Sequence, residues 1–289
     1  MWVSDSWVDF SLLDCSDGER LEQWGPFTLA RPDPQVIWHT TRRHPAWRHP
    51  DARYVRSHTG GGSWEAHRLP ASWEIRYGSY IFIVKPMNFK HTGLFPEQAV
   101  NWDWLAGQIR TAGRPIRLLN LFAYTGGATV AAAAAGAEVC HVDAARGMVA
   151  LARENAAASG LSHKPIRWIV DDCRDFVTRE IKRGRRYDAL VLDPPSFGRG
   201  TSGDVWKLED DLYHLLILCA GILSDKPLCV LLNSYTAGLA PGVLTCLLRG
   251  ALPSGLGGRV ESAELGLPIR ENGWILPCGA TARLLFNEG

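Results

Sequence analysis

Residues 118–127 read Leu118-Leu119-Asn120-Leu121-Phe122-Ala123-Tyr124-Thr125-Gly126-Gly127. The apolar start is typical of a buried strand, and the two glycines predict a tight turn behind it. The alanine-rich run at 128–135 then predicts the first turns of a helix. A strand, a glycine turn and a helix N-terminus bring backbone N–H groups close to a bound nucleotide or nucleoside. This stretch therefore predicts a parallel sheet with a ligand at the carboxyl end of its first strand.

Acidic residues follow the next strands in order. Asp143 ends the second expected strand, Asp171 and Asp172 follow the third, and Asp193 follows the fourth. In a doubly wound sheet these strand ends share one edge, where the ligand lies. Asp143 is placed to accept hydrogen bonds from ribose hydroxyls, and Asp172 to accept from an adenine amino group. An Asp after a strand also fits a helix N-cap, and this alternative stays open for Asp171.

The segment after the fourth strand is Asp193-Pro194-Pro195-Ser196-Phe197. Two prolines stiffen the turn and remove two N–H donors, so its carbonyls can accept from an exocyclic amino group. Phe197 is a candidate for stacking on a planar base, although a rigid turn with a core Phe is the plainer alternative. A nicotinamide enzyme would need G-x-G-x-x-G at the first turn, and this chain lacks that spacing.

Apolar strands alternate with helical segments from Arg117 onward. We expect strands at 117–121, 138–142, 165–170, 187–192 and 228–232, with helices near 128–136, 147–158, 173–183, 206–223 and 241–251. Further β runs near 259–265 and 280–286 predict an antiparallel edge hairpin. The pattern predicts an α/β fold with a doubly wound, mostly parallel, seven-stranded sheet.

The N-terminal part has a different composition, because nine of the 12 tryptophans lie at or before Trp104. We therefore expect two domains: a Trp-rich, β-rich domain at 1–100 and a second domain at 101–289. Expected strands lie at 27–30 and 35–38, and 73–77 and 80–84 predict a hairpin joined at Gly78-Ser79. The stretch from Arg42 to Gly62 is expected to be a loop that ends in a flexible glycine run, 60–63.

That expected loop interleaves basic and aromatic residues: Arg42, Arg43, Trp47, Arg48, Arg53, Tyr54 and Arg56. Cations hold phosphates and aromatic rings stack on unpaired bases, so the pattern fits RNA. It fits an ordinary exposed loop equally well. Nearby histidines (His39, His44, His49, His58) lack the spacing of metal ligands, and we expect no metal.

The bulk composition excludes several classes. A formal net charge of +1 gives no global attraction to nucleic acid or to a membrane. No apolar stretch approaches the roughly 18 residues of a membrane span, and the start lacks the features of a secretory signal. The seven cysteines form no C-x-x-C pair, and several lie in apolar segments. We expect a cytoplasmic protein with free thiols and no membrane contact.

From about Trp73 to the end, the chain resembles the class I S-adenosylmethionine (SAM) methyltransferases, in particular the bacterial large-subunit (23S) rRNA methyltransferases that modify cytosine C5 or guanine N7. No PUA domain is recognisable. The resemblance rests on Thr92-Gly93-Leu94-Phe95-Pro96-Glu97-Gln98, which is similar to the family's T-G-x-F-x-D-Q-R, on 120–127 and on 191–197.

The resemblance implies SAM as the cofactor, S-adenosylhomocysteine (SAH) as its product, and catalytic residues at Asp193, Pro194, Pro195 and Phe197. The implied cofactor contacts are Thr92, Phe95, Gln98, Asn120, Phe122, Ala123, Tyr124, Gly126, Gly127, Asp143, Ala144, Asp171, Asp172, Cys173 and Asp193.

Two departures from the family pattern matter. Ala99 stands where the family motif has its arginine. The cytosine-C5 members carry a cysteine after the fifth strand, whereas this chain has Asn233-Ser234-Tyr235-Thr236. C5 methylation needs a thiolate that attacks C6, because C5 is otherwise unreactive. The sequence therefore favours a base nitrogen as the target, unless Cys173 or Cys278 lies in the pocket.

The leading hypothesis is SAM-dependent methylation of a base in ribosomal or other structured RNA. A methyltransferase of a protein or a small molecule is the first alternative, since the near-zero net charge fits it as well. A non-catalytic RNA-binding module with the same fold is the second. The sequence says nothing of the oligomeric state.

Overall fold

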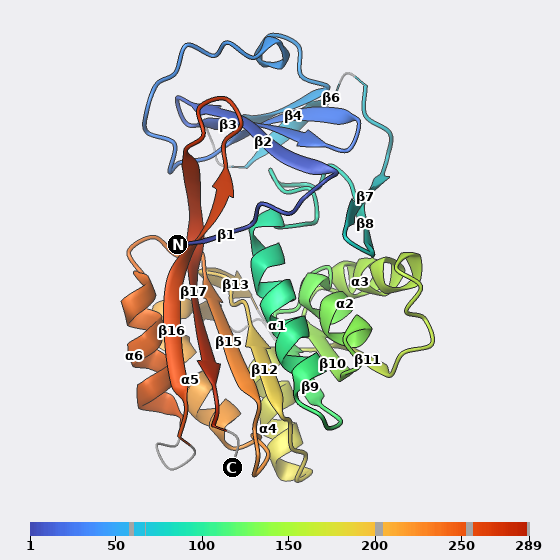
Figure 1. Ribbon diagram of the computed structural model, residues 1–289, viewed down its shortest axis with the longest axis vertical. Coiled ribbons are helices and arrows are strands. Elements are labelled where there is room, and N and C mark those ends of the chain that lie inside the picture. Colours follow the sequence, from blue (N-terminus) through green and yellow to red (C-terminus); the bar gives the residue numbers. More distant parts are fainter. Residues whose placement is uncertain (58–60, 67, 200–204, 253–256, 288–289) are drawn as a thin grey trace. The chain divides into compact units, whose positions relative to one another are not determined.

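Parallel strands form the centre of one of the two units into which the chain divides (Figure 1). The computed structural model describes residues 1–57, 61–66, 68–199, 205–252 and 257–287. The larger unit comprises Met1–Trp2, Val100–Leu265 and Gly279–Gly289, and the smaller unit comprises Val3–Ala99 and Gly266–Cys278. The expected domain division at residue 100 stays a prediction.

The sheet of the larger unit has the strand order β1-β16-β17-β15-β12-β9-β10-β11. Its strands are β1 (Trp2–Val3), β9 (Arg117–Leu121), β10 (Glu138–Asp143), β11 (Ile166–Val170), β12 (Ala189–Leu192), β15 (Cys229–Ser234), β16 (Arg259–Pro268) and β17 (Ile275–Leu285). Strands β11, β10, β9, β12 and β15 pair in parallel, and β17 pairs antiparallel with β15. The predicted doubly wound, mostly parallel sheet is confirmed. It has eight strands among the described residues rather than seven, because β1 adds to its edge.

Helices cover both faces of this sheet: α1 (Ala99–Thr111), α2 (Gly127–Ala134), α3 (Arg146–Ala158), α4 (Cys173–Lys182), α5 (Leu208–Ala220) and α6 (Pro241–Ala251). One face carries apolar side chains such as Leu119, Leu121 and Val142, which pack with α4, α5 and α6 in one buried cluster. The alternate residues of the same strands include Asn120 and His141, which meet α2. Burial on both faces explains why the central strands are almost wholly apolar.

The chain builds this sheet outward from β9 through β10 to β11 and then returns to β12 on the other side of β9. Strand order therefore reverses between β9 and β12. In an open α/β sheet the ligand crevice lies beside the carboxyl ends of the strands at such a reversal. The expected strands and helices from residue 117 onward are found within a few residues of their expected positions.

The smaller unit holds a sheet of order β2-β3-β4-β5-β6 and the hairpin β7-β8. The strands are β2 (Phe10–Ser16), β3 (Glu19–Trp24), β4 (Phe27–Pro32), β5 (Ala52–Arg56), β6 (Gly62–Ala66), β7 (Trp73–Tyr77) and β8 (Tyr80–Val84). A short 3-10 helix, η1 (Pro45–Trp47), lies between β4 and β5, and a second, η2 (Pro96–Gln98), lies between β8 and α1. The predicted hairpin of 73–77 and 80–84 is confirmed. No helix among the described residues is long and apolar enough to cross a membrane.

Two expectations for the smaller unit are wrong. The segment at 35–38 is not a strand, because the Asp33 carboxylate accepts from the Gln35 N–H at 3.0 Å and bends the chain into a turn. The expected loop from Arg42 to Gly62 contains η1 and β5, and β5 pairs with both β4 and β6. His58 and Gly60 lie outside the described residues.

The basic and aromatic residues of that stretch are largely used inside the unit. Trp47 is buried, and its indole N–H donates to Asp14 Oδ2 at 2.8 Å. Tyr54 is buried as well. Arg42 pairs with Glu19 at 2.9 Å and lies over the Trp47 ring, and Arg53 pairs with the same carboxylate. Both aromatic rings of the pattern, Trp47 and Tyr54, are therefore covered by protein.

Candidate active site

The turn after β9 has an unusual backbone. Phe122 and Tyr124 have φ values of 53° and 49°, and Gly126 has a φ of 84°. Non-glycine residues in the left-handed region cost roughly 1–3 kcal/mol each, and they concentrate at ligand-binding loops. The Ala123 N–H donates to the Val142 carbonyl at 3.0 Å, which ties the turn to β10. The neighbouring strand thus holds a strained loop at the carboxyl edge of the sheet.

Asp143 fixes the same loop from the end of β10. Its Oδ2 accepts from the Tyr124 N–H at 2.8 Å, and its Oδ1 accepts from the Ala145 N–H at 2.8 Å. Burial raises the pKa of Asp143, and the two backbone donors oppose that rise. Ala144 lies beside it, half-buried. Asp143 therefore shapes the loop, and its expected contact with a ligand stays a prediction.

The two acidic residues after β11, Asp171 and Asp172, have different roles. Asp172 caps α4, and its Oδ1 accepts from the Arg174 and Asp175 N–H groups at 2.9 and 3.2 Å. Within the described chain, Oδ2 of Asp172 receives no such bond. Asp171 is not the cap and pairs with Arg179 instead. Asp172 thus keeps an acceptor for an external donor.

Cys173 lies directly under the β9 turn. Its Sγ accepts from the Phe122 N–H at 3.3 Å, and its side chain is buried. Burial raises the pKa of this thiol well above its ordinary value. The thiol is therefore protonated and supports the backbone of the loop.

The Asp193–Phe197 segment leaves β12 next to this turn. The Asp193 N–H donates to the Leu121 carbonyl at 3.4 Å, and Pro194 is buried whereas Pro195 is exposed. The Ser196 hydroxyl lies 2.6 Å from Thr236 Oγ1, which follows β15. Phe197 is 58% exposed, so its ring is not part of the core. The segment thus presents an aromatic side chain at the same edge of the sheet.

Trp206 is a residue of this site that the sequence did not indicate. It lies in β14 (Val205–Lys207), which pairs with β13 (Phe197–Arg199) behind the proline turn. Its indole N–H donates to the Pro195 carbonyl at 2.7 Å, and its ring centre lies 5.1 Å from that of Phe122. A carbonyl expected to accept from a ligand is therefore already bonded. The sequence predicts a helix from residue 206, which would include Trp206. The helix α5 begins only at Leu208, and Trp206 lies in β14 before it.

Gly126 and Gly127 are required by packing. A Cβ on Gly126 would meet Ala152 Cβ of α3 at 2.9 Å, and a Cβ on Gly127 would meet Trp102 Cζ2 of α1 at 2.5 Å. The positive φ of Gly126 adds a backbone reason. Their expected role in admitting a ligand stays a prediction.

Asn120 faces the interior. It is buried, and its Nδ2 donates to Thr129 Oγ1 at 3.0 Å. Thr129 Oγ1 in turn lies 3.0 Å from His141 Nδ1. This chain of polar groups links β9, α2 and β10 beneath the turn, so the Asn120 amide supports the loop from below.

The expected cofactor segment 92–98 belongs to the smaller unit. Thr92 and Gln98 are buried, and Phe95 is half-buried at the start of η2. The Pro96 carbonyl accepts from Ser4 Oγ at 2.8 Å and from Trp7 Nε1 at 2.9 Å, which fixes the turn within that unit.

The larger unit brings together a strained loop and three carboxylates, at the ends of the consecutive strands β11, β10, β9 and β12. Asp172, Asp143 and Asp193 provide acceptors, which suit the hydroxyl and amino donors of an adenosyl group. Their negative charge also suits a sulfonium. The hydrogen-bond acceptors and the negative charge at this edge therefore fit SAM.

Comparisons with known proteins agree with this geometry. A family model described as S-adenosylmethionine-dependent methyltransferase matches residues 35–226. The crystal structure of the SAM-dependent methyltransferase from Agrobacterium tumefaciens is 38% identical, with a TM-score of 0.93, and the match covers 98% of this chain and 92% of that one. A structure from Streptococcus mutans, 18% identical with a TM-score of 0.75, covers 97% of this chain and 76% of its own and has the same fold.

The curated proteins that this chain resembles are longer than the chain itself. A protein named ribosomal RNA large subunit methyltransferase K/L from Methylococcus capsulatus is 32% identical over 60% of this chain and 21% of its own length. One of the same name from Shewanella sp. (strain MR-4) is 35% identical over 47% of this chain and 19% of its own. The matches thus span about a fifth of these relatives. The family model covers most of this chain, and the chain belongs to the S-adenosylmethionine-dependent methyltransferases.

Proposed function

We propose that this enzyme methylates a base in ribosomal or other structured RNA, with a base nitrogen as the acceptor. The exposed Phe197 directly behind the stiff Asp-Pro-Pro turn carries the proposal, because an aromatic ring at this edge suits a base taken out of its stack. The name of the curated relatives, ribosomal RNA large subunit methyltransferase K/L, supports the choice of ribosomal RNA. Such a substrate favours the cytoplasm as the place of action.

The proposed cofactor contacts are those expected from the sequence. Asp143 accepts from the ribose hydroxyls, Oδ2 of Asp172 accepts from the adenine amino group, and the 122–127 turn supplies its backbone. Trp206, packed on Phe122, covers the turn on the side of β14. Bound SAM supplies a methyl group already activated by its sulfonium. The protein then contributes mainly alignment and exclusion of water.

Asp193 and Phe197 hold the acceptor in this scheme. The Phe197 ring stacks on the base, and the Asp193 carboxylate accepts a hydrogen bond from an N–H of the base, which orients the reacting nitrogen. The hydroxyl pair Ser196–Thr236 and the indole of Trp206 keep the proline turn in place.

The cysteines favour nitrogen over C5. Burial raises the pKa of both Cys173 and Cys278 well above the ordinary value, and each is almost completely covered by protein. Attack on C6 of a pyrimidine needs an accessible thiolate. Neither residue supplies one, whereas a base nitrogen needs no covalent activation.

The test is methyl incorporation from labelled SAM into ribosomal RNA taken from cells that lack this protein. We expect Asp193→Ala to lower incorporation about 100-fold, because misplacement of a reacting group by an ångström costs this much. Asp210→Ala, at an exposed position in the first turn of α5, is the matched control and should retain activity. Undiminished incorporation in Asp193→Ala would overturn the assignment of Asp193.

The product and the substrate class are checked separately. Mass spectrometry of nucleosides from RNA of cells with and without the protein should show one N-methylated base that depends on it. A C5-methylated pyrimidine would contradict the choice of acceptor. Label in cell extract that resists ribonuclease would favour the protein or small-molecule substrate instead.

A further inference from the structure

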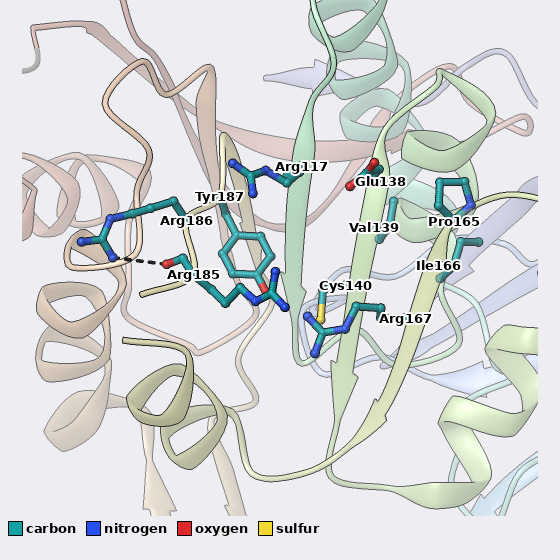
Figure 2. A pocket seen from close by; sticks show the side chains of 10 residues that line it. All are labelled: Arg117, Glu138, Val139, Cys140, Pro165, Ile166, Arg167, Arg185, Arg186 and Tyr187. Atoms are coloured by element: carbon teal, nitrogen blue, oxygen red, sulfur yellow. Dashed lines mark hydrogen bonds between the residues drawn. The ribbon is translucent and has the colours of Figure 1, made fainter. Parts of the chain in front are cut away.

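A cleft opens at the opposite edge of the sheet from the proposed active site. It has a volume of about 340 Å³ and lies where three parallel strands begin, with Arg117, Glu138 and Ile166 as the first residues of β9, β10 and β11 (Figure 2). The five residues of β9 separate the two edges. At a rise of about 3.3 Å per residue this is on the order of 15 Å, so the cleft is a separate site.

The rim of the cleft is strongly basic. Four arginines line it, Arg117, Arg167, Arg185 and Arg186, against one acid, Glu138. Arg167 pairs with Glu180 at 3.5 Å. Within the described residues, no carboxylate lies within ion-pair distance of the other three guanidinium groups, all of which are exposed. Arg186 only donates to the Arg185 carbonyl, at 3.2 Å.

Apolar residues form the floor of the cleft. Val139 and the ring of Tyr187 are buried there, and half-buried Ile166 and exposed Pro165 line its side. The Tyr187 hydroxyl donates to Glu180 Oε2 at 2.6 Å, which fixes the ring, and Figure 2 shows the arginine side chains around it. Uncompensated guanidinium groups around an apolar floor suit an anion that carries a planar or hydrocarbon body.

Phosphate is the anion that fits best. Guanidinium groups bind phosphate oxygens through paired hydrogen bonds, and an exposed arginine without a carboxylate partner is free to do so. The volume falls within the range of small-molecule sites, roughly 300–1,000 Å³, which admits one nucleotide. We propose that this cleft binds a nucleotide through its phosphate, as a second ligand site separate from the methyl-donor site.

The nucleotide has two possible sources, a free mononucleotide or the backbone of an RNA strand. Only the second source rests on the proposed RNA substrate. In that case the arginines hold backbone phosphates at a distance from the base being methylated, which positions the RNA without reading its sequence.

The experiment uses the full chain saturated with SAH, so that the adenosyl site is closed to the probe. Calorimetric titration with uridine 5′-monophosphate should show binding, and uridine without its phosphate should not bind. We expect Arg117→Gln and Arg186→Gln each to lower the affinity for uridine 5′-monophosphate by roughly tenfold or more. Arg249→Gln, which removes an exposed arginine from the last turn of α6, is the matched control and should bind as the wild type does.

A second arm measures fluorescence anisotropy of a labelled oligouridylate. A parallel loss in Arg117→Gln and Arg186→Gln, with a shallower salt dependence, assigns the cleft to an RNA strand. Unchanged oligouridylate affinity together with lost monophosphate affinity assigns it to a free nucleotide. No binding of the monophosphate, or equal affinities in all variants, overturns the proposal. Methyl incorporation by the wild type is scored in the same preparation, so that failure of the proposed function and failure of the cleft are told apart.

Discussion

At the scale of single residues, His141 shows what a buried titratable group costs. It lies on β10 with no exposed surface, and its Nδ1 is 3.0 Å from Thr129 Oγ1. Within the described chain, Nε2 has no hydrogen-bond partner. Burial lowers the pKa of His141 to about 3 from an ordinary 6.5, because a charged imidazole there would be desolvated.

This shift predicts a specific acid sensitivity. Below about pH 6.5 His141 binds a proton in the unfolded chain but not in the folded chain. The free energy of unfolding therefore falls as the pH drops from 6.5 toward 3. The loss from this residue is about 1.4 kcal/mol at about pH 5.5. Urea unfolding of His141→Gln at neutral and acidic pH should show a smaller fall than the wild type. His163→Gln, at an exposed position, should keep the full fall, and equal falls in all three proteins would contradict the prediction.

At the scale of elements, the β9 turn depends on close approach of two helices. Gly127 opens α2 against the indole of Trp102 in α1, with no room for a Cβ. Gly107 lies within α1, where a Cβ would meet nothing within 4 Å. The two glycines therefore have opposite consequences although both are helical.

We expect Gly127→Ala to lower the free energy of unfolding by about 1–3 kcal/mol, as overpacking does. Gly107→Ala should raise it by roughly 0.5–1 kcal/mol, because alanine loses less conformational entropy in a helix. Both values follow from urea titrations at neutral pH. A Gly127→Ala protein as stable as the wild type would show that Trp102 moves aside freely.

The elements also show where sequence patterns fail. Strands β9 to β12 are nearly continuous apolar runs and were predicted closely. Strands β2 and β3 were missed, since they carry Asp14 and Glu22 at buried positions. Glu22 pairs with Arg31 of the neighbouring strand β4 at 2.6 Å and with Arg20 of its own strand at 3.1 Å. A charged residue is normally predicted to lie at the surface, and its burial can be explained only once its ion-pair partner is known.

At the scale of the whole molecule, the first strand contacts the last, because Trp2 lies in β1 and Arg283 in β17. The Trp2 ring lies 3.8 Å from the guanidinium carbon of Arg283, and Trp104 lies 5.1 Å from it. Arg283 donates to Asn101 Oδ1 from Nε and from one terminal nitrogen, at 3.0 and 2.7 Å. Burial lowers the pKa of Arg283 to about 10. A desolvated cation is thus stabilised by two indole faces, one from β1 and one from α1.

Trp2→Ala should therefore destabilise the protein by about 2 kcal/mol, the value of a desolvated cation–π contact. Trp274→Ala is the matched control, since that ring is 57% exposed and its loss should cost little. Thermal or urea unfolding measures both. Equal effects of the two substitutions would show that the contact between Trp2 and Arg283 contributes nothing.

The sequence by itself determined the parallel core, the positions of its strands along the chain and the acids at their carboxyl ends, because apolar runs, glycine turns and local spacing encode these features. Only the tertiary structure assigned Trp206 to the proline turn, gave Asp172 rather than Asp171 the helix cap, and covered Trp47 with protein. It alone gathered four arginines at the amino ends of the strands. The helix cap depends on where α4 begins, at Cys173. The other outcomes depend on residues far apart in the chain, and local patterns do not show which distant groups meet.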